Sequence, residues 1–256
     1  MNSIYPVLSG ALAQEKRLEL ITNNLANVST SGFKKDIAIF EGLTPLSTDA
    51  AGTHVQFQAR LLGSDSTFGL LKAVKTDFSA GAIQVTDEPL DLAIQGEGFF
   101  AVQSPEGVRY TRNGHFTLDS DRQLVTTSGY PVLGSGGPIS FPPGIVTIDS
   151  SGNVSVRGSE AGATIIAVDI LPVYTVSNPN NLKKVGGSLF KVVNGTAVPS
   201  IEGQIQQGAL EGSNVNSVEE MVAMISVMRR YEAAQKAIQT ADDIAGKAAN
   251  EIGRMG

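Results

Sequence analysis

Cysteine and tryptophan are absent from this 256-residue chain, and histidine occurs only twice, as His54 and His115. A chain without cysteine has no disulfide framework, no thiolate ligand for zinc and no cysteine nucleophile. Charged residues make up 17% of the chain, below the usual ~25%. These absences exclude a disulfide-stapled or metal-stapled miniprotein, and the length is sufficient for one large domain or two modest ones.

Long apolar runs and patches of a single charge sign are also missing. No run approaches the ~18–20 residues that a membrane helix needs. The net charge is −6 and no segment is a basic patch, which argues against nucleic acid or anionic lipid as a partner. The first residues, Met-Asn-Ser-Ile-Tyr-Pro, lack the basic and apolar regions of a cleaved secretory signal. These signals alone predict a cytosolic protein.

What the sequence does contain is a heptad pattern at each end. Near the N-terminus, steps of three and four residues reach eight positions, of which seven are apolar. They are Ile4, Val7, Ala11, Gln14, Leu18, Ile21, Leu25 and Val28. Pro6 falls in the first turn, where its missing N–H would be unpaired anyway. We expect a helix that ends before the turn formers at 29–32.

The C-terminal heptad pattern is stricter and longer. The same stepping reaches ten positions without a polar residue, namely Met224, Val227, Tyr231, Ala234, Ile238, Ala241, Ala245, Ala248, Ile252 and Met255. A second apolar stripe runs beside it through Val218, Met221, Ile225 and Met228. The capping-box spacing from Ser217 to Glu220 marks the start. The pattern predicts a helix from about 217 to 252, a length at which coiled coils become candidates.

The pattern in the middle of the chain predicts strands. Short alternating or apolar runs bounded by turn formers occupy 82–102 and 108–134, a hairpin is indicated at 145–156, and further strands at 163–176 and 188–193. Residues 44–70 show neither period and are expected to be extended or irregular. The predicted fold class is mixed α and β, with long N- and C-terminal heptad helices forming a coiled-coil-like layer and an inserted antiparallel β domain. The predicted boundaries are 1–29 with 216–256 for the helical domain, 30–74 for a connector and 75–215 for the β-rich outer domain.

No residue pattern supports a catalytic, metal or cofactor site. The Gly-x-Gly-x-x-Ala run at 96–101 matches a dinucleotide fingerprint, but strand-like residues follow it where a helix is required. Asp119 and Asp121 are expected in a solvated turn, and His115 is expected to be structural. Arg109 and Arg112 are expected to be strand-edge charges. We therefore expect neither an enzyme nor a protein with a cofactor or a small-molecule substrate.

The two heptad helices could pack on each other within the chain or against other chains. The apolar face of the C-terminal helix is wider than one partner helix covers, and full burial of a large aliphatic side chain contributes ~1.5–3 kcal/mol. This favours contacts between chains. The expected assembly interface consists of Ile4, Val7, Ala11, Leu18, Ile21, Asn24, Leu25, Val28, Met224, Val227, Tyr231, Ala234, Ile238, Ala241, Ala245 and Ile252. Gly32 is expected in a left-handed turn after the first helix, with Phe33 as its anchor.

Three motifs carry a resemblance to a known family. Asn-Asn-Leu-Ala-Asn-Val-Ser-Thr-Ser-Gly-Phe-Lys at 23–34 resembles the signature of bacterial flagellar axial proteins of the basal-body rod and hook. The segments at 90–102, 110–116 and 129–134 are similar to their core β domain, and 210–222 followed by Met-Arg-Arg-Tyr-Glu resembles their C-terminal signature. The motifs stand in the family's order over nearly the whole chain.

The resemblance implies a structural subunit without enzymatic activity, most similar to the proximal-rod member and next to the distal-rod member. Members of the family build a helical tube whose terminal helices line the export channel. The implied partners are other rod proteins, further copies of the chain and the flagellar type III export apparatus, and the implied location is the periplasmic rod, reached without a cleaved signal peptide. A secreted β-rich adhesin or binding module with helical oligomerisation ends is the alternative that shares the composition.

Overall fold

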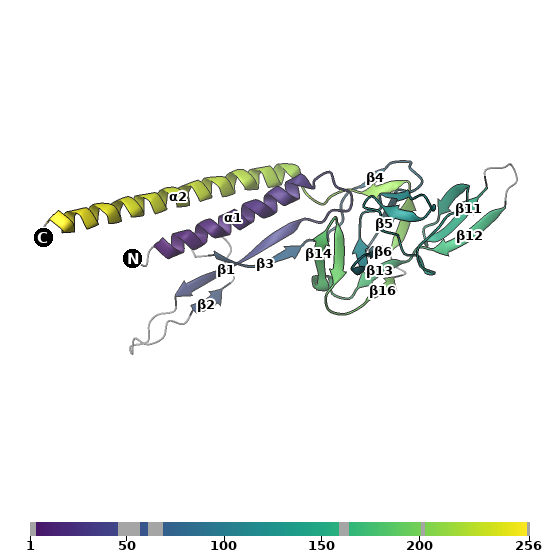
Figure 1. Ribbon diagram of the computed structural model, residues 1–256, viewed down its shortest axis with the longest axis horizontal. Coiled ribbons are helices and arrows are strands. Elements are labelled where there is room, and N and C mark those ends of the chain that lie inside the picture. The colour runs from purple at the N-terminus through teal and green to yellow at the C-terminus, as the bar shows by residue number, and fades with distance from the viewer. Residues whose placement is uncertain (1–3, 46–56, 61–68, 159–163, 201–202, 255–256) are drawn as a thin grey trace. The chain divides into compact units, whose positions relative to one another are not determined.

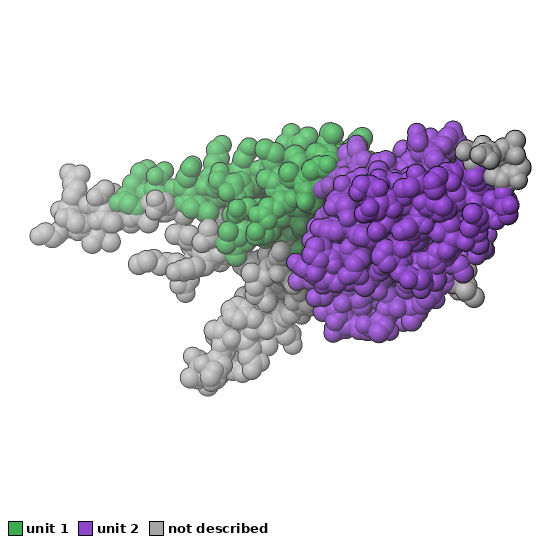
Figure 2. All heavy atoms as spheres, turned by 45° about the vertical axis from the view of Figure 1, so that its right-hand side comes forward, with its two compact units in different colours: residues 1–26, 36–76, 216–256 green, residues 27–35, 77–215 purple. Residues whose placement is uncertain are grey.

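The computed structural model describes residues 4–45, 57–60, 69–158, 164–200 and 203–254. The chain divides into two units, coloured separately in Figure 2. Unit 1 combines residues 1–26, 36–76 and 216–256, and unit 2 combines residues 27–35 and 77–215. The fold is mixed, with two α-helices and many antiparallel strands in the described residues. No helix among these residues is long and apolar enough to cross a membrane.

Unit 1 contains both terminal helices, α1 (Ile4–Ala26) and α2 (Ser217–Arg254), which pack against each other (Figure 1). Both helices begin and end close to the predicted boundaries. α1 also contacts β1 (Asp36–Pro45) and β3 (Gly69–Thr76), which form an antiparallel sheet in the order β2-β1-β3 with β2 (Phe57–Arg60). The expected connector at 30–74 therefore contributes three strands to the same unit as the helices. The parts of that segment at 46–56 and 61–68 lie outside the described residues.

The pairing of β1 with β3 contains a register shift. β1 pairs with β3 from Asp36 opposite Thr76 onward, and the register shifts between Ile39 and Phe40. A bulge of this kind interrupts the two-residue alternation on which strand prediction depends. In addition, Ile37 is exposed whereas Ile39 and Phe40 are both half-buried. Exposure therefore does not alternate from residue to residue in this part of β1.

Unit 2 is built from fifteen short described strands and one turn of 3-10 helix. The strands are β4 (Ile83–Val85), β5 (Leu92–Gln95), β6 (Phe100–Ser104), β7 (Gly107–Thr111), β8 (Phe116–Leu118), β9 (Leu124–Thr126), β10 (Ile145–Ile148), β11 (Asn153–Arg157), β12 (Ile165–Ile170), β13 (Val173–Val176), β14 (Leu182–Gly186), β15 (Leu189–Val192), β16 (Ala197–Ser200), β17 (Gln204–Gln207) and β18 (Ala209–Glu211), and η1 spans Pro179–Asn181. Their pairings are antiparallel, in the sheets β10-β11-β12, β13-β16, β14-β15-β7-β6, β17-β5, β18-β4 and β8-β9. The hairpin predicted at 145–156 is confirmed.

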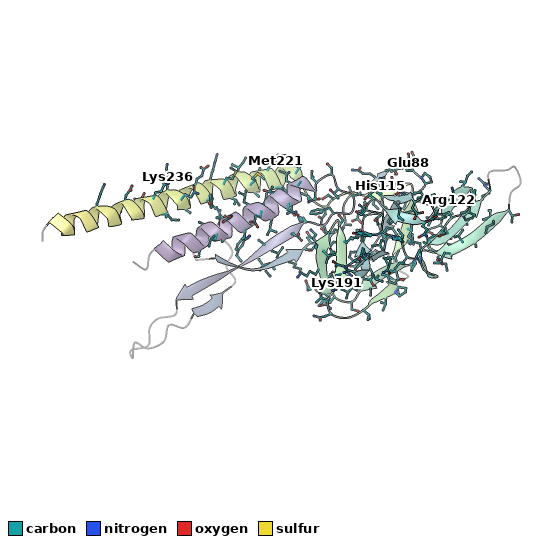
Figure 3. The ribbon with its side chains drawn as sticks, in the orientation of Figure 1. Glu88, His115, Arg122, Lys191, Met221 and Lys236 are labelled. Atoms are coloured by element: carbon teal, nitrogen blue, oxygen red, sulfur yellow. The ribbon has the colours of Figure 1, made fainter. Side chains whose placement is uncertain are left out.

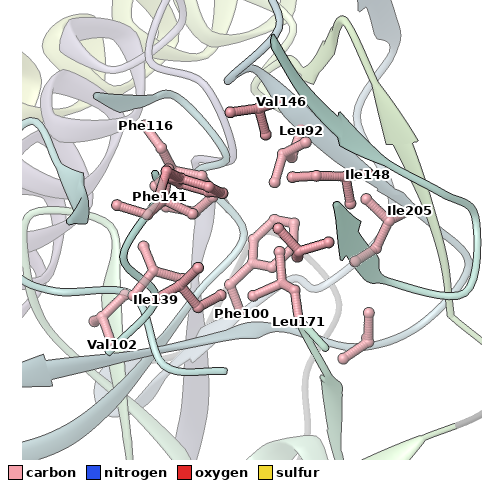
Figure 4. Close-up of a cluster of buried hydrophobic side chains, with 14 of the residues drawn as sticks. Leu92, Phe100, Val102, Phe116, Ile139, Phe141, Val146, Ile148, Leu171 and Ile205 are labelled. Atoms are coloured by element: carbon pink, nitrogen blue, oxygen red, sulfur yellow. The ribbon is translucent and has the colours of Figure 1, made fainter. Parts of the chain in front are cut away.

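The core of unit 2 is one apolar cluster to which many of these short strands contribute. Leu92, Phe100, Ile139 and Leu171 are almost completely buried in it (Figure 4). A second cluster is aromatic, with the rings of Phe99 and Phe190 5.7 Å apart in an edge-on arrangement. Because each strand is only three to six residues long, the cluster rather than any single sheet holds unit 2 together.

The β10–β11 hairpin is closed by an aspartate turn. The Oδ1 atom of Asp149 accepts the backbone N–H groups of Ser151 and Asn153, each at 2.9 Å. The side-chain amide of Asn153 donates to Asp149 Oδ2 at 2.7 Å, and these hydrogen bonds hold the pKa of the Asp149 carboxyl below its usual value. Gly152 supplies the left-handed position with φ of +85°.

The β8–β9 hairpin uses the same turn thirty residues earlier. Asp119 Oδ1 accepts the backbone N–H groups of Asp121 and Gln123 at 2.9 and 2.8 Å. Arg122, at φ +58°, stands where the later turn has glycine, and its guanidinium donates to the carbonyl oxygen of Phe141. The Asp119–Asp121 pair is thus a hairpin turn, as expected, with its first carboxylate directed at the chain's own backbone.

Candidate assembly surface and buried junction

The predicted heptad residues fall mainly on α1 and α2, which pack against each other. Ala11, Ile21 and Val227 are buried, and Val227 is only 1% exposed. Leu18, Leu25, Val28, Met224, Tyr231, Ala234 and Ile238 are half-buried. The side chains of Ile4, Val7, Ala241, Ala245 and Ile252 lie outside the described residues. Because α1 and α2 pack against each other, the described heptad residues are buried or half-buried already within one chain.

A second apolar stripe on α2 is largely uncovered by the described residues. We call it the outer stripe. It consists of Val218, Met221, Val222, Ile225 and Met228, which are 46–67% exposed. The spacing of three and four residues puts these side chains on one face of the helix. Figure 3 labels one of them, Met221, on the first turns of α2. The same face becomes polar further along, at Glu232 and Lys236, so the outer stripe ends within the first turns of α2.

Asn24 has a role within unit 1 that the sequence analysis missed. Its side chain is 2% exposed, and its amide group donates to the carbonyl oxygen of Asp36 at 3.0 Å while its Oδ1 accepts the Asp36 N–H at 3.0 Å. The amide also lies 3.4 Å from Glu220 Oε1. Asn24 thereby ties α1 to the first residue of β1 and to the first turn of α2. Its hydrogen bonds are made inside its own chain, although it was expected at an interface between chains.

The start of α2 is capped by Asn216 rather than by Ser217. The Oδ1 atom of Asn216 accepts the N–H groups of Val218 and Glu219 at 3.1 and 3.4 Å. An asparagine in this position satisfies donors that the first helical turn cannot use internally. The capping residue therefore lies one position before the predicted one.

Gly32 and Phe33 adopt the predicted turn. Gly32 has φ of +66°, and a Cβ atom placed there would lie 2.3 Å from the backbone carbon of Arg112. Both the dihedral angle and the space therefore require glycine. Phe33 is buried, and the ammonium group of Lys184 lies 4.1 Å from the centre of its ring.

Next to this turn lies a buried triad of charges, Lys34, Arg112 and Glu211. Lys34 Nζ is 2.6 Å from Glu211 Oε1, and Arg112 Nη1 is 3.0 Å from Glu211 Oε2. The Lys34 and Glu211 side chains are each 1% exposed and that of Arg112 is 5% exposed. Burial lowers the pKa of the Lys34 ammonium, and the Glu211 carboxylate opposes this shift.

The triad corrects the expectation that Arg109 and Arg112 are strand-edge charges, because both are buried. Arg112 also donates to the carbonyl oxygens of Ile94 and Gly96. Arg109 donates to Glu106, whose carboxylate is exposed. Sequence offered no signal for the triad, since its members are separated by 78 to 177 residues.

The remaining polar candidate, His115, pairs with a buried aspartate. His115 Nδ1 lies 2.7 Å from Asp91 Oδ1, and half of the histidine side chain is exposed. The two residues also form an isolated β-bridge. This arrangement supports the expected structural role and supplies the partner that the sequence analysis did not find. Among the described residues, no group of three acidic, histidine or cysteine side chains could hold a metal ion.

The fold and these side chains define a protein of helical and β-rich units whose distinguishing surface is an exposed apolar helix face. Three family models match the chain. "Flagella basal body rod protein" matches residues 4–34, "Flagellar hook protein FlgE/F/G D1 domain" matches 93–156, and "Flagellar basal body rod FlgEFG protein C-terminal" matches 206–251.

Relatives align over nearly the whole length. The flagellar basal-body rod protein FlgG of Borreliella burgdorferi is 38% identical over 98% of both chains, and FlgG of Bacillus subtilis is 35% identical over 95% of this chain and 96% of its own. FlgF of Caulobacter vibrioides is 33% identical over 99% of both chains. The chain belongs to the flagellar basal-body rod protein family. It is a structural subunit of the flagellar basal body that assembles with other axial proteins.

Proposed function

We propose that this subunit builds a helical tube in which α1 and α2 form a coiled-coil-like inner layer around the export channel. The outer stripe of α2 supports this proposal most directly. The exposed part of these apolar side chains remains in water and does not stabilise the single chain. Covering them in a neighbouring subunit removes that apolar area from water, and full burial of one such side chain contributes ~1.5–3 kcal/mol.

The geometry of the contact follows from the chemistry of the stripe. The outer stripe lies on α2 alone. If a neighbouring subunit covers it with a different surface, the two subunits meet through unlike surfaces, which is a head-to-tail contact. Head-to-tail contacts that do not close into a ring continue as a helix. Long helices packed side by side in this way would form a stiff layer, which suits the transmission of torque along a rod.

The proposed assembly interface therefore shifts from the heptad stripe to the outer stripe. The heptad residues Leu18, Leu25 and Ile238 hold the helix pair together, and Val218, Met221 and Ile225 meet the neighbour. Ile4, Val7, Ala241, Ala245 and Ile252 remain proposed interface residues. We also propose that β1 to β3 belong with the helical layer, so that the division at 1–29, 30–74, 75–215 and 216–256 gives way to unit 1 and unit 2.

Export is the second part of the proposal. The chain would leave the cytoplasm through the flagellar type III export apparatus and assemble in the periplasm, which requires no cleaved signal peptide. A chain without cysteine supports this route, because it forms no disulfides when it enters an oxidising compartment. The comparisons give no support to the alternative of a secreted adhesin or binding module.

Deleting the gene and imaging purified basal bodies tests the proposal. We expect basal bodies with an incomplete rod, restored when the wild-type chain is supplied from a plasmid. The same images distinguish the proximal position, which the sequence predicts, from the distal one, since the rod would end at different heights. Complete rods in the deletion strain would contradict the proposed function.

A further inference from the structure

We propose that Glu211 closes unit 2, so that segments 27–35 and 77–81 lock onto the unit only when residues 209–215 have docked. The inference concerns the folding of unit 2 and does not depend on the proposed function. It rests on the position of one carboxylate between two buried cations that come from distant parts of the chain.

The carboxylate of Glu211 is shared among three segments. Oε1 accepts from Lys34 Nζ at 2.6 Å and from the backbone N–H of Gly81 at 2.9 Å. Oε2 accepts from Arg112 Nη1 at 3.0 Å. Among the described residues, Lys34 and Arg112 make their only recorded ion pairs with Glu211. One carboxylate is therefore ion-paired with two cations.

The backbone around Glu211 joins the same segments. The N–H of Gly32 donates to the carbonyl oxygen of Glu211 at 2.7 Å, and the N–H of Gly212 donates to that of Ala82 at 2.8 Å. Each of these amides reports on whether residues 209–215 are docked, although neither touches the carboxylate itself.

Asn214 completes the closure. Its Oδ1 accepts the N–H of Lys35 at 2.7 Å, and its side-chain amide donates to the carbonyl oxygen of Asp77 at 2.9 Å. The N–H of Asp77 in turn donates to the carbonyl oxygen of Lys35 at 2.9 Å. Residues 35, 77 and 214, which are far apart in the sequence, thus form one hydrogen-bonded ring.

The charges make this closure conditional. Without Glu211, burying Lys34 and Arg112 would leave two cations near each other. Their remaining hydrogen-bond partners would be neutral carbonyl oxygens, and Asp77 would be the carboxylate that still acts on Lys34. Removing one partner of a buried ion pair shifts a folding equilibrium by roughly 10²- to 10⁴-fold. Glu211 follows Lys34 and Arg112 in the chain and is therefore synthesised after them. A chain that ends before Glu211 cannot close this part of unit 2.

The three matched family segments meet at this point. Lys34 lies in the first, Arg112 in the second and Glu211 in the third. The triad is therefore the place at which the N-terminal, central and C-terminal motifs of the chain touch in unit 2.

Amide hydrogen exchange of the full-length Glu211→Gln variant tests the inference. Gln keeps the shape of the side chain and removes its charge. We expect the amides of Gly32 and Gly212 to lose protection together, by roughly 10² or more. The amide of Leu124, which bonds to the carbonyl oxygen of Ile139 within the core, should keep its protection.

Two outcomes would overturn the inference. If Gly32 keeps wild-type protection, the segments do not close together. If Leu124 loses as much protection as Gly32, the triad stabilises unit 2 as a whole and has no local role. Glu106→Gln is the matched control, because that carboxylate is exposed although it also pairs with an arginine, and it should leave all these amides unchanged.

A double variant keeps the test decisive if Glu211→Gln does not fold. Lys34→Met removes one of the two cations, so Lys34→Met combined with Glu211→Gln leaves only Arg112 without a counter-charge. We expect the double variant to be more stable to urea than Glu211→Gln alone. A double variant that is equally or less stable would show that uncompensated charge is not the cause.

Discussion

Replacing Ile225 with aspartate should separate the stability of the subunit from its assembly. Ile225 is 53% exposed on the outer stripe, and substitutions at exposed helix positions usually change stability by within about 0.5 kcal/mol. Val227, two residues away, is buried, and Val227→Ala removes two buried carbons and leaves a cavity, at a cost of about 2 kcal/mol. Urea unfolding of the two purified variants measures this difference.

Assembly should be impaired by Ile225→Asp and not by Val227→Ala. In the proposed tube, Ile225→Asp loses the burial of an apolar side chain and places an unpaired carboxylate in the contact, which weakens each contact by at least ~3 kcal/mol, or more than a hundredfold in affinity. We expect a strain that carries this variant to lack complete rods, counted in images of purified basal bodies. Val227→Ala, which leaves the outer stripe intact, should still be incorporated.

Lys236→Asp is the matched control. It lies on the same face of α2 eleven residues further along, where the surface is polar, and it should unfold and assemble like the wild type. Normal rods in the Ile225→Asp strain would refute the assignment of the outer stripe as the contact. So would a loss of stability as large as that of Val227→Ala, because Ile225 would then be packed within the subunit.

Three further results are expected. Asn24→Ala should lower the free energy of unfolding by about 2–3 kcal/mol in urea, because it leaves the backbone of Asp36 without two buried partners; a change below 0.5 kcal/mol, on the order of an exposed substitution, would contradict this role. Gly32→Ala should cost at least ~3 kcal/mol, whereas Gly129→Ala, with φ of +80° but open space around it, should cost only about 1–2 kcal/mol; equal urea midpoints would show that the close approach to Arg112 is unimportant. The pKa of Asp149 is depressed in the folded chain. Its ionised carboxylate therefore adds to the free energy of unfolding above the unfolded pKa of 3.8, and this contribution is lost as the pH falls through the lower folded pKa. The difference in the free energy of unfolding between the wild type and Asp149→Asn, measured in urea, should therefore shrink from pH 5 towards pH 3. A constant difference would contradict this role of Asp149.

Local patterns in the sequence predicted the local structure well. The helix limits followed from heptads and turn formers, and the hairpin at 145–156 followed from an aspartate turn between alternating strands. Both signals lie within a few residues of the structure they specify. Gly32 was also predictable, because a glycine after a helix commonly takes the left-handed conformation.

Long-range contacts were not predictable from a single chain. Arg112 sits in a strand-like run with polar neighbours, and its burial depends on Glu211, which lies 99 residues away. Asn24 resembled a surface residue because its partner, the backbone of Asp36, carries no sequence signal. The choice between the two apolar stripes of α2 likewise depended on where α1 packs, which spacing alone does not determine.

The ring formed by Lys35, Asp77 and Asn214 also has a kinetic consequence. α1 and α2 are separated by some 190 residues, and closing a flexible loop of that length costs about 4–5 kcal/mol of chain entropy. Once unit 2 has formed, hydrogen bonds hold residue 35 beside residue 214. α2 begins three residues after one of these fixed points, and α1 ends nine residues before the other. The effective loop between the helices is then short. Pairing of the first and last helices thus becomes an almost local event, and the slow search that their separation in sequence would demand is carried out in advance by unit 2.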